Sequence, residues 1–269
     1  MSHRAPAALA LILALLAPGL TACGGGQGKA PGLAGGHPAR PDTLPAPEDP
    51  LIHAGARGVH GGRFVATQRQ DPKTWNALTA NEAASTDITN GHFFVSLVAF
   101  NNRTQENEPG LARSWEMSAD GRSWTFHLRR GVRWSDGTPL TADDVIFTSR
   151  ILYDEAIHPS AGDLCRVDGL PFRFEKVDPT TVRIVLEKPY GAFLSVLGAV
   201  YILPRHKLEA AYLAGQFESA YGLSTPPSEI VSAGPWVLSS YEPQQKVVLK
   251  PNPYYYGFDG TGKRLPYLD

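Results

Sequence analysis

Apolar and polar residues alternate along three stretches of the chain. In the first stretch, Trp124, Phe126 and Leu128 are separated by polar residues and follow a turn-forming Asp120-Gly121 pair. A period of two is typical of a strand that buries one face, and a turn between two such runs is typical of a hairpin. The pattern therefore predicts three antiparallel hairpins, over residues 114–128, 172–186 and 236–250.

A helical pattern begins after the first hairpin. Thr141 lies three residues before Asp144, the spacing at which a hydroxyl and a carboxylate cap the first turn of a helix. We expect a helix from Ala142 to about Tyr153, with an apolar side broad enough to cover a sheet. A shorter helix is expected over residues 207–214, closed by a glycine.

Three further segments have less regular patterns. Arg63–Thr67 follows a Gly-Gly pair and predicts an opening strand. Gly91–Val98 has apolar positions that fit either a buried helix or a strand, and periodicity does not choose between them. Val132 and Trp134 are expected to resume the first hairpin before a tight turn over residues 135–139.

The N-terminal region shows neither the alternation of a strand nor the spacing of an amphipathic helix. The run Ala7–Ala17 contains only Ala, Leu and Ile and follows Arg4, as in a secretory signal. It is too short for a transmembrane helix, which needs about 20 apolar residues, so a permanent membrane span is disfavoured. Residues 24–50 contain seven Gly, six Pro and no Phe, Trp or Tyr, so we expect a disordered tether over residues 24–59.

Composition and charge narrow the class of protein. The 269 residues include 25 Lys and Arg against 26 Asp and Glu, a net charge of -1. A nucleic-acid binder usually needs a cationic surplus, so we expect no nucleic-acid partner. With 42% hydrophobic and 19% charged residues, the chain is globular and long enough for one large or two small domains.

The polar residues support neither catalysis nor metal binding. Ser135, Asp136 and His127 could be imagined as a triad, but the serine and aspartate are turn formers and no Gly-x-Ser-x-Gly motif is present. His127 falls on the polar side of its strand, where a solvated or cross-strand role is expected. The histidines form no His-Glu-x-x-His pattern. We therefore expect no enzyme activity, no metal and no cofactor.

The two cysteines have different expected roles. Cys165 has no cysteine partner nearby and is expected to be buried as a small apolar residue. Leu20-Thr21-Ala22-Cys23 ends the apolar run and resembles the lipobox of bacterial lipoproteins. The resemblance implies a signal peptide over residues 1–23 and a lipid anchor on Cys23. The alternative is an ordinary signal-region cysteine that is discarded on cleavage.

The middle of the chain carries a longer set of motifs. They are Pro109-Gly110-Leu111-Ala112-Arg113-Ser114-Trp115-Glu116, Asp120-Gly121, Trp124-Thr125-Phe126-His127-Leu128-Arg129, Gly131-Val132-Arg133-Trp134-Ser135-Asp136-Gly137-Thr138-Pro139 and Thr141-Ala142-Asp143-Asp144-Val145. Further matches are Ile202-Leu203-Pro204, Gly234-Pro235-Trp236, Val248-Leu249 and Asn252-Pro253-Tyr254-Tyr255-Tyr256. Together they resemble the extracellular solute-binding protein family 5, the dipeptide and oligopeptide receptors of ABC importers, over roughly Gly61 to Asp269.

The resemblance implies an α/β fold with mixed sheets, of the periplasmic-binding-protein type II. A first ligand-binding lobe would comprise residues 60–88 and 199–269, and a satellite subdomain residues 89–198. Members of the family are usually about twice as long, so we expect an N-terminal fragment or a truncated product without the second lobe. The face that would meet that lobe is then expected to expose apolar surface and to bind a hydrophobic dye.

The resemblance also implies a ligand site. The expected contacts are Asn81, Glu82, Ala83, Ala84, Ala199, Val200, Tyr201, Gly234 and Trp236. Such a surface would hold an extended peptide through its backbone, with water in roomy side-chain pockets. The structural alternative is that Trp236 and Tyr201 belong to the core and that Glu82 is simply exposed.

The expected function is that of a substrate-binding lipoprotein. It would capture peptides or a related small solute and deliver them to ABC permease subunits with their ATPase, anchored to the cell envelope through Cys23. One alternative is a lobe that serves as a cell-surface interaction module. Another is a nickel, haem or sugar receptor of the same fold, because fold does not fix the ligand.

Overall fold

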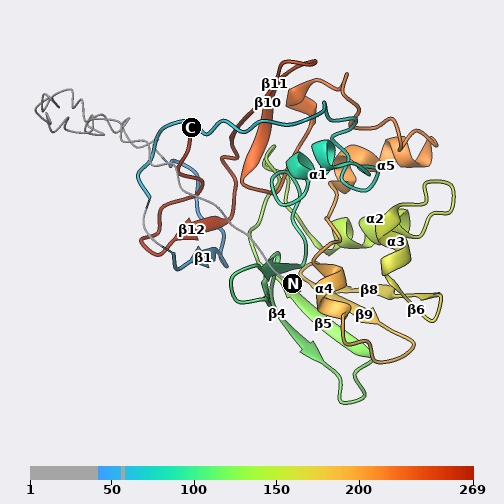
Figure 1. Cartoon of the computed structure of the whole chain (residues 1–269). Helices are drawn as coiled ribbons and strands as arrows, with labels where there is room; N and C mark the ends of the chain where they lie inside the picture. The colour runs from blue at the N-terminus through green and yellow to red at the C-terminus, as the bar shows by residue number, and fades with distance from the viewer. Residues whose placement is uncertain (1–41, 56–57) are drawn as a thin grey trace, which may run out of the picture. The chain divides into compact units, whose positions relative to one another are not determined.

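The computed structural model describes residues 42–55 and 58–269 (Figure 1). The expected signal peptide, the lipid anchor and most of the tether lie outside these residues. Within them, no helix is long and apolar enough to cross a membrane. The helices are α1 (Ala83–Thr89), α2 (Ala142–Leu152), α3 (Ser160–Leu164), α4 (Phe193–Leu197), α5 (Arg205–Leu213) and the 3-10 helix η1 (Pro227–Glu229). The strands are β1 (Leu51–His53), β2 (Val98–Asn101), β3 (Glu106–Pro109), β4 (Ala112–Met117), β5 (Ser123–Leu128), β6 (Arg166–Val167), β7 (Leu170–Pro171), β8 (Arg173–Asp178), β9 (Thr181–Val185), β10 (Trp236–Glu242), β11 (Lys246–Pro251) and β12 (Gly257–Asp259).

Two of the predicted hairpins join into one sheet. The hairpins β4–β5 and β8–β9 pair through β5 and β9, which gives the antiparallel order β4-β5-β9-β8. Phe126 faces Val182 across the β5–β9 pair, and both side chains are fully buried. The Phe193 ring of α4 lies 6.1 Å from the Phe126 ring, so α4 covers this face of the sheet. The third predicted hairpin is confirmed as β10–β11, a separate two-stranded sheet.

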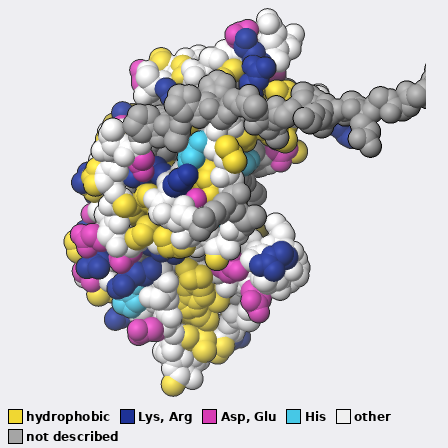
Figure 2. Space-filling model, turned by 90° about the vertical axis from the view of Figure 1, so that its left-hand side faces the viewer, with side chains coloured by type: hydrophobic (Ala, Val, Ile, Leu, Met, Phe, Trp, Pro, Cys, Tyr) yellow, Lys and Arg dark blue, Asp and Glu magenta, His cyan; other side chains and the backbone are white. Residues whose placement is uncertain are grey.

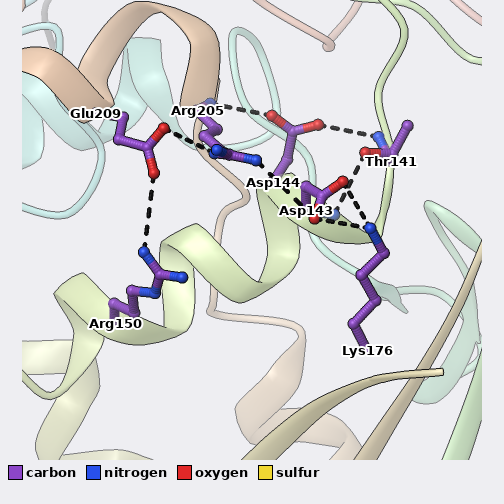
Figure 3. A network of polar contacts seen from close by, with 7 residues as sticks. All are labelled: Thr141, Asp143, Asp144, Arg150, Lys176, Arg205 and Glu209. Atoms are coloured by element: carbon purple, nitrogen blue, oxygen red, sulfur yellow. Dashed lines mark hydrogen bonds and ion pairs between the residues drawn. The ribbon is translucent and has the colours of Figure 1, made fainter. Parts of the chain in front are cut away.

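The predicted capping box at α2 is confirmed, and it also fixes a second helix (Figure 3). The Thr141 amide donates to one Asp144 carboxylate oxygen at 2.9 Å. The Arg205 amide, at the start of α5, donates to the other oxygen at 3.0 Å. Asp144 is 5% exposed, and burial raises the pKa of its carboxyl, against the two amides, which lower it. A single buried carboxylate therefore caps both α2 and α5.

Exposed ion pairs surround this carboxylate. Asp143 accepts a hydrogen bond of 2.8 Å from the Lys176 ammonium on β8. The Arg205 guanidinium donates to Glu209 at 2.8 Å, and Arg150 approaches the same carboxylate at 3.8 Å (Figure 3). Exposed pairs of this kind contribute at most about 1 kcal/mol each, less than is expected for the buried Asp144 carboxylate.

Two predicted elements are wrong, and most of a segment left open between helix and strand is neither. Arg63–Thr67 is extended but pairs with no described strand, and Phe64 and Val65 are about three-quarters exposed. Gly91–Ser96 is neither helix nor strand: it makes single bridges, such as Ser96 with Tyr201, although Phe93 and Phe94 are fully buried. After Gly131 the first hairpin does not resume, and Arg133 makes only an isolated bridge to Pro139.

Apolar surface is present on the described part of the chain. Val59, Phe64 and Val65 are each at least 75% exposed. Hydrophobic side chains also gather on the lower half of the face in Figure 2, at the level where Figure 1 places β4 and β5. Strong binding of a hydrophobic dye stays a prediction for the purified chain.

The end of the predicted tether is ordered, contrary to expectation. We call residues Asp42–His53 the N-terminal strap. Arg264 is 9% exposed and donates to the Asp42 carboxylate at 3.1 Å and to the Leu44 carbonyl at 3.0 Å. At the other end of the strap, Leu51–His53 forms β1 and pairs in parallel with β12.

The middle of the strap is held by two further arginines. Arg129 donates to the Pro50 carbonyl at 2.9 Å, and Arg130 donates to the Asp49 carboxylate at 3.0 Å. Composition predicted disorder because this proline-rich stretch buries little apolar surface. Its extended backbone instead leaves carbonyl groups free, and the guanidinium groups of Arg129 and Arg264 bind them.

Arg264→Lys is expected to loosen the strap. An ammonium group cannot reproduce the several divergent hydrogen bonds of the guanidinium, so the free energy of unfolding should fall by about 2 kcal/mol. Amide hydrogen exchange over residues 42–53 should become faster. Arg173→Lys is the matched control, because Arg173 is 69% exposed and pairs with Glu175, away from the strap. Unchanged strap exchange in the Arg264 variant would contradict the assignment.

Candidate functional site

A pocket of about 420 Å³ lies beside the loop that precedes α1. Its walls come from three separate parts of the sequence. The lining residues are Lys73, Thr74, Leu78, Thr79, Asn81, Glu82, Ile157, His158, Pro159 and Glu218. Asn81 and Glu82 are two of the nine residues expected at a ligand site, and the other seven lie elsewhere.

Glu82 shapes the wall of this pocket. Its carboxylate accepts a hydrogen bond from the Lys73 amide at 3.1 Å and another from the Ser85 hydroxyl. Burial raises the pKa of Glu82, but the Ser85 hydroxyl and the Lys73 amide outweigh it and hold the pKa below its usual value. Glu82 therefore ties the loop at Lys73 to the first turn of α1.

The neighbours of Glu82 differ in accessibility. Asn81 and Ala83 are exposed, and of these two Asn81 lines the pocket. Ala84 is buried, and its carbonyl accepts a hydrogen bond of 3.1 Å from the Gln68 side chain. Asn81 is thus the member of this group whose side chain is available to a ligand in the pocket.

Gly234 and Trp236 lie against the segment that follows α1. The Gly234 amide donates to the Phe93 carbonyl at 2.8 Å, and the Trp236 amide donates to the His92 carbonyl at 3.2 Å. A Cβ atom on Gly234 would lie 2.2 Å from the His92 carbonyl oxygen. Gly234 is therefore required by the close approach of two backbones.

Ala199–Tyr201, the third group of predicted ligand contacts, lies against the other end of the segment 92–96 that follows α1. Tyr201 forms an antiparallel bridge with Ser96, and the next amide, of Ile202, donates to the Val95 carbonyl at 2.9 Å. Val200 is 3% exposed, and burial raises the pKa of the partly exposed Tyr201. Residues 92–96 thus join two of the predicted groups, and ligand contact by those groups stays a prediction.

Sequence reasoning missed half of the pocket. Ile157, His158 and Pro159 form its second wall, and Glu218 adds to it from beyond α5. His158 has a φ of 46° and directly precedes a proline, a position where residues are normally extended. A histidine-proline pair in a loop is a weak signal in sequence, and strained backbone of this kind gathers at functional sites.

Ser135, Asp136 and His127, the residues considered for catalysis, each bind another partner and form no triad. His127 lies 3.7 Å from Glu116 on the neighbouring strand, as expected for a cross-strand role. Asp136 bonds the His206 ring at 2.8 Å, and the Ser135 hydroxyl accepts from the Ser232 amide. Among residues 42–55 and 58–269, no cluster of His, Cys, Asp and Glu could hold a metal ion. The Cys165 thiol is buried, which raises its pKa to about 12.

The chain is similar to a family of bacterial proteins and to individual members of it. The family model described as bacterial extracellular solute-binding proteins, family 5 Middle, matches residues 106–269. A probable ABC transporter-binding protein of Deinococcus radiodurans is 31% identical over 217 residues, which cover 78% of this chain and 36% of the relative. The dipeptide-binding protein of Escherichia coli is 30% identical over 231 residues, covering 80% of this chain and 41% of the relative.

Solved structures agree on the fold. The periplasmic binding protein MelB of Agrobacterium fabrum, in complex with stachyose, matches with a TM-score of 0.65 and 26% identity, covering 82% of this chain and 33% of that chain. DppA of Helicobacter pylori, in complex with a peptide, matches with a TM-score of 0.63 and 25% identity, covering 78% and 42%. The expected α/β fold of periplasmic binding proteins is confirmed, and the chain spans well under half the length of these relatives.

Proposed function

This chain belongs to the bacterial extracellular solute-binding proteins of family 5, and on that premise we propose that it forms one wall of the ligand site in a receptor of an ABC importer. The observation that carries the proposal is the open pocket of about 420 Å³. Its second wall, Ile157–Pro159, and Glu218 lie within the region that matches the family. Concave surfaces with a few polar groups are the usual sites for small ligands.

We propose that the ligand is a peptide or a related small solute. Relatives include the E. coli dipeptide-binding protein and a di/tripeptide-binding protein of Pseudomonas aeruginosa. The pocket combines charged groups, amide and hydroxyl groups, and apolar side chains, which suits a peptide backbone with a small side chain.

A sugar is the second candidate. The stachyose complex of MelB and the alpha-galactoside-binding protein of Rhizobium meliloti motivate it. Sugar rings commonly stack on aromatic side chains, and the lining residues of this pocket include no Phe, Trp or Tyr. The charged lining therefore favours the peptide.

We propose a first lobe over residues 60–88 and 199–269 and a satellite subdomain over residues 89–198. Residues 1–23 would act as a signal peptide and Cys23 as the lipid anchor in the cell envelope. The receptor would release its ligand to permease subunits that work with an ATPase. The N-terminal strap shortens the proposed tether, since residues 42–53 pack on the folded part.

Titration of the purified chain with dialanine and with stachyose tests the proposal. We expect dialanine to shift the amide resonances around Asn81 with a dissociation constant of about 1 mM, the range for one wall of a site, about -4 kcal/mol. Stachyose should shift them less. Asn81→Trp should fill the pocket and weaken dialanine binding at least about fivefold, or about 1 kcal/mol.

The control is Asn102→Trp, at an exposed position between β2 and β3 that is outside the pocket lining. It should leave binding unchanged. If neither ligand shifts the pocket resonances, the receptor proposal fails for this pocket, and a surface interaction module becomes the better description.

A further inference from the structure

The second wall of the pocket belongs to a short loop between α2 and α3. The loop runs over residues 153–159 and carries Ile157, His158 and Pro159 of the pocket lining. His158 has a φ of 46°. A left-handed backbone is uncommon for a residue other than glycine, and it persists only where the surrounding structure holds it. The second wall therefore depends on the contacts that hold this loop.

Asp154 collects hydrogen bonds from this loop and from α5. One of its carboxylate oxygens accepts from the Ala156 amide at 2.9 Å. Its carbonyl accepts from the His158 amide at 2.8 Å. The other carboxylate oxygen accepts from the Tyr212 hydroxyl at 2.8 Å. The first two bonds close the loop on itself, and the third ties the loop to α5.

The Tyr212 ring also contacts the segment that carries Glu218. Tyr212 lies in the last turn of α5, and its ring meets the Phe217 ring edge to face, with 6.2 Å between the centroids. Phe217 is 2% exposed and directly precedes Glu218, which lines the pocket. On α2, the Phe147 ring meets the Tyr212 ring at 6.0 Å. Tyr212 thus contacts both segments of the chain that form the second wall.

The charge of Asp154 strengthens its bond with Tyr212. The Tyr212 hydroxyl is the main reason that the pKa of the Asp154 carboxyl lies below its usual value. The same bond raises the pKa of Tyr212. At neutral pH the carboxylate is therefore ionised and the hydroxyl protonated, and a hydrogen bond to an ionised acceptor is stronger than one between neutral groups.

We propose that Tyr212 is the positioning residue of the second wall, which it holds through its hydrogen bond to Asp154 and its ring contact with Phe217. The inference rests on the proposed receptor function and adds what keeps the pocket in its binding shape. Without the hydroxyl bond, residues 155–158 can relax toward extended backbone, so a smaller fraction of the molecules has a formed pocket. The affinity for a ligand falls in proportion to that fraction.

Tyr212→Phe tests the hydroxyl alone, because the variant keeps the ring and its contacts. We expect its dissociation constant for dialanine to rise about threefold to tenfold, between the value of an exposed ion pair and that of a charged hydrogen bond. Hydrogen exchange of the His158 amide should become faster. The pKa of Asp154, followed through its carboxyl carbon resonance, should rise toward its usual value.

Two further variants serve as control and as second test. Tyr190→Phe is the matched control: Tyr190 is also partly buried, its hydroxyl bonds no residue within 42–55 and 58–269, and it lies outside the pocket lining. It should leave dialanine binding and His158 exchange unchanged. Asp154→Ala removes the acceptor, and in that background Tyr212→Phe should weaken dialanine binding no further.

The outcomes separate this inference from the receptor proposal. If Tyr212→Phe binds dialanine as tightly as the parent chain, the positioning role is overturned and the receptor proposal stands. The role is also overturned if binding weakens while His158 exchange is unchanged, or if Tyr212→Phe weakens binding just as much in the Asp154→Ala background. If the parent chain does not bind dialanine, the receptor proposal fails and this inference fails with it.

Discussion

Gly234→Ala is expected to lower the free energy of unfolding by about 3 kcal/mol, because overpacking against a fixed backbone is costly. The added Cβ atom would lie 2.2 Å from the His92 carbonyl oxygen and 2.7 Å from its carbonyl carbon. Both are backbone atoms, and the hydrogen bonds from Gly234 and Trp236 hold them in place. The new methyl group can be accommodated only by separating these two segments.

Chemical denaturation of the variant and the parent chain measures this effect. Gly191→Ala is the control, since its Cβ atom would meet nothing within 4 Å, and it should change stability by less than about 0.5 kcal/mol. A Gly234 variant as stable as the Gly191 variant would show that the two segments can separate freely.

Asp144→Ala is expected to cost about 3 kcal/mol, because it leaves two partly buried amides without a partner, each at about 1–3 kcal/mol. The amides belong to Thr141 and Arg205, at the starts of α2 and α5. Loss of the carboxylate therefore uncaps two helices at once, whereas loss of an ordinary N-cap costs about 1 kcal/mol.

Two further substitutions test whether this loss belongs to the Asp144 carboxylate. Asp143→Ala removes the neighbouring, exposed carboxylate that binds Lys176, and should cost less than about 1 kcal/mol. Asp144→Asn keeps one acceptor oxygen and should lie between the two alanine variants. Equal losses for Asp143→Ala and Asp144→Ala would contradict the double-capping role.

The parts of the fold that could be predicted are those fixed by neighbours in the sequence. The hairpins β4–β5 and β8–β9 and the cap of α2 depend on turns and spacings within a few residues. Arg63–Thr67 has the composition of a strand, but no described strand lies beside it. The strap was missed because its partners Arg129 and Arg264 are far away in the sequence.

The candidate site was predicted only in part for the same reason. Asn81 and Glu82, which the family resemblance places at a ligand site, line the pocket, and their contact with a ligand stays a prediction. The opposite wall, Ile157–Pro159, and Glu218 come from distant segments that carry no motif. Gly234 was expected at the ligand, and its contact with the His92 backbone gives it a structural reason that no sequence pattern could reveal.

The docking of the strap has a consequence for the order in which the chain folds. Protein chains are made from the N-terminus, so residues 42–53 are among the first of the described residues to emerge. Their partners in β12 and Arg264 are among the last. The local hairpins can close during synthesis, but the strap must wait until residues 257–264 are available. Docking of the strap is therefore late among the folding steps of the described residues, and until then the strap stays a free segment.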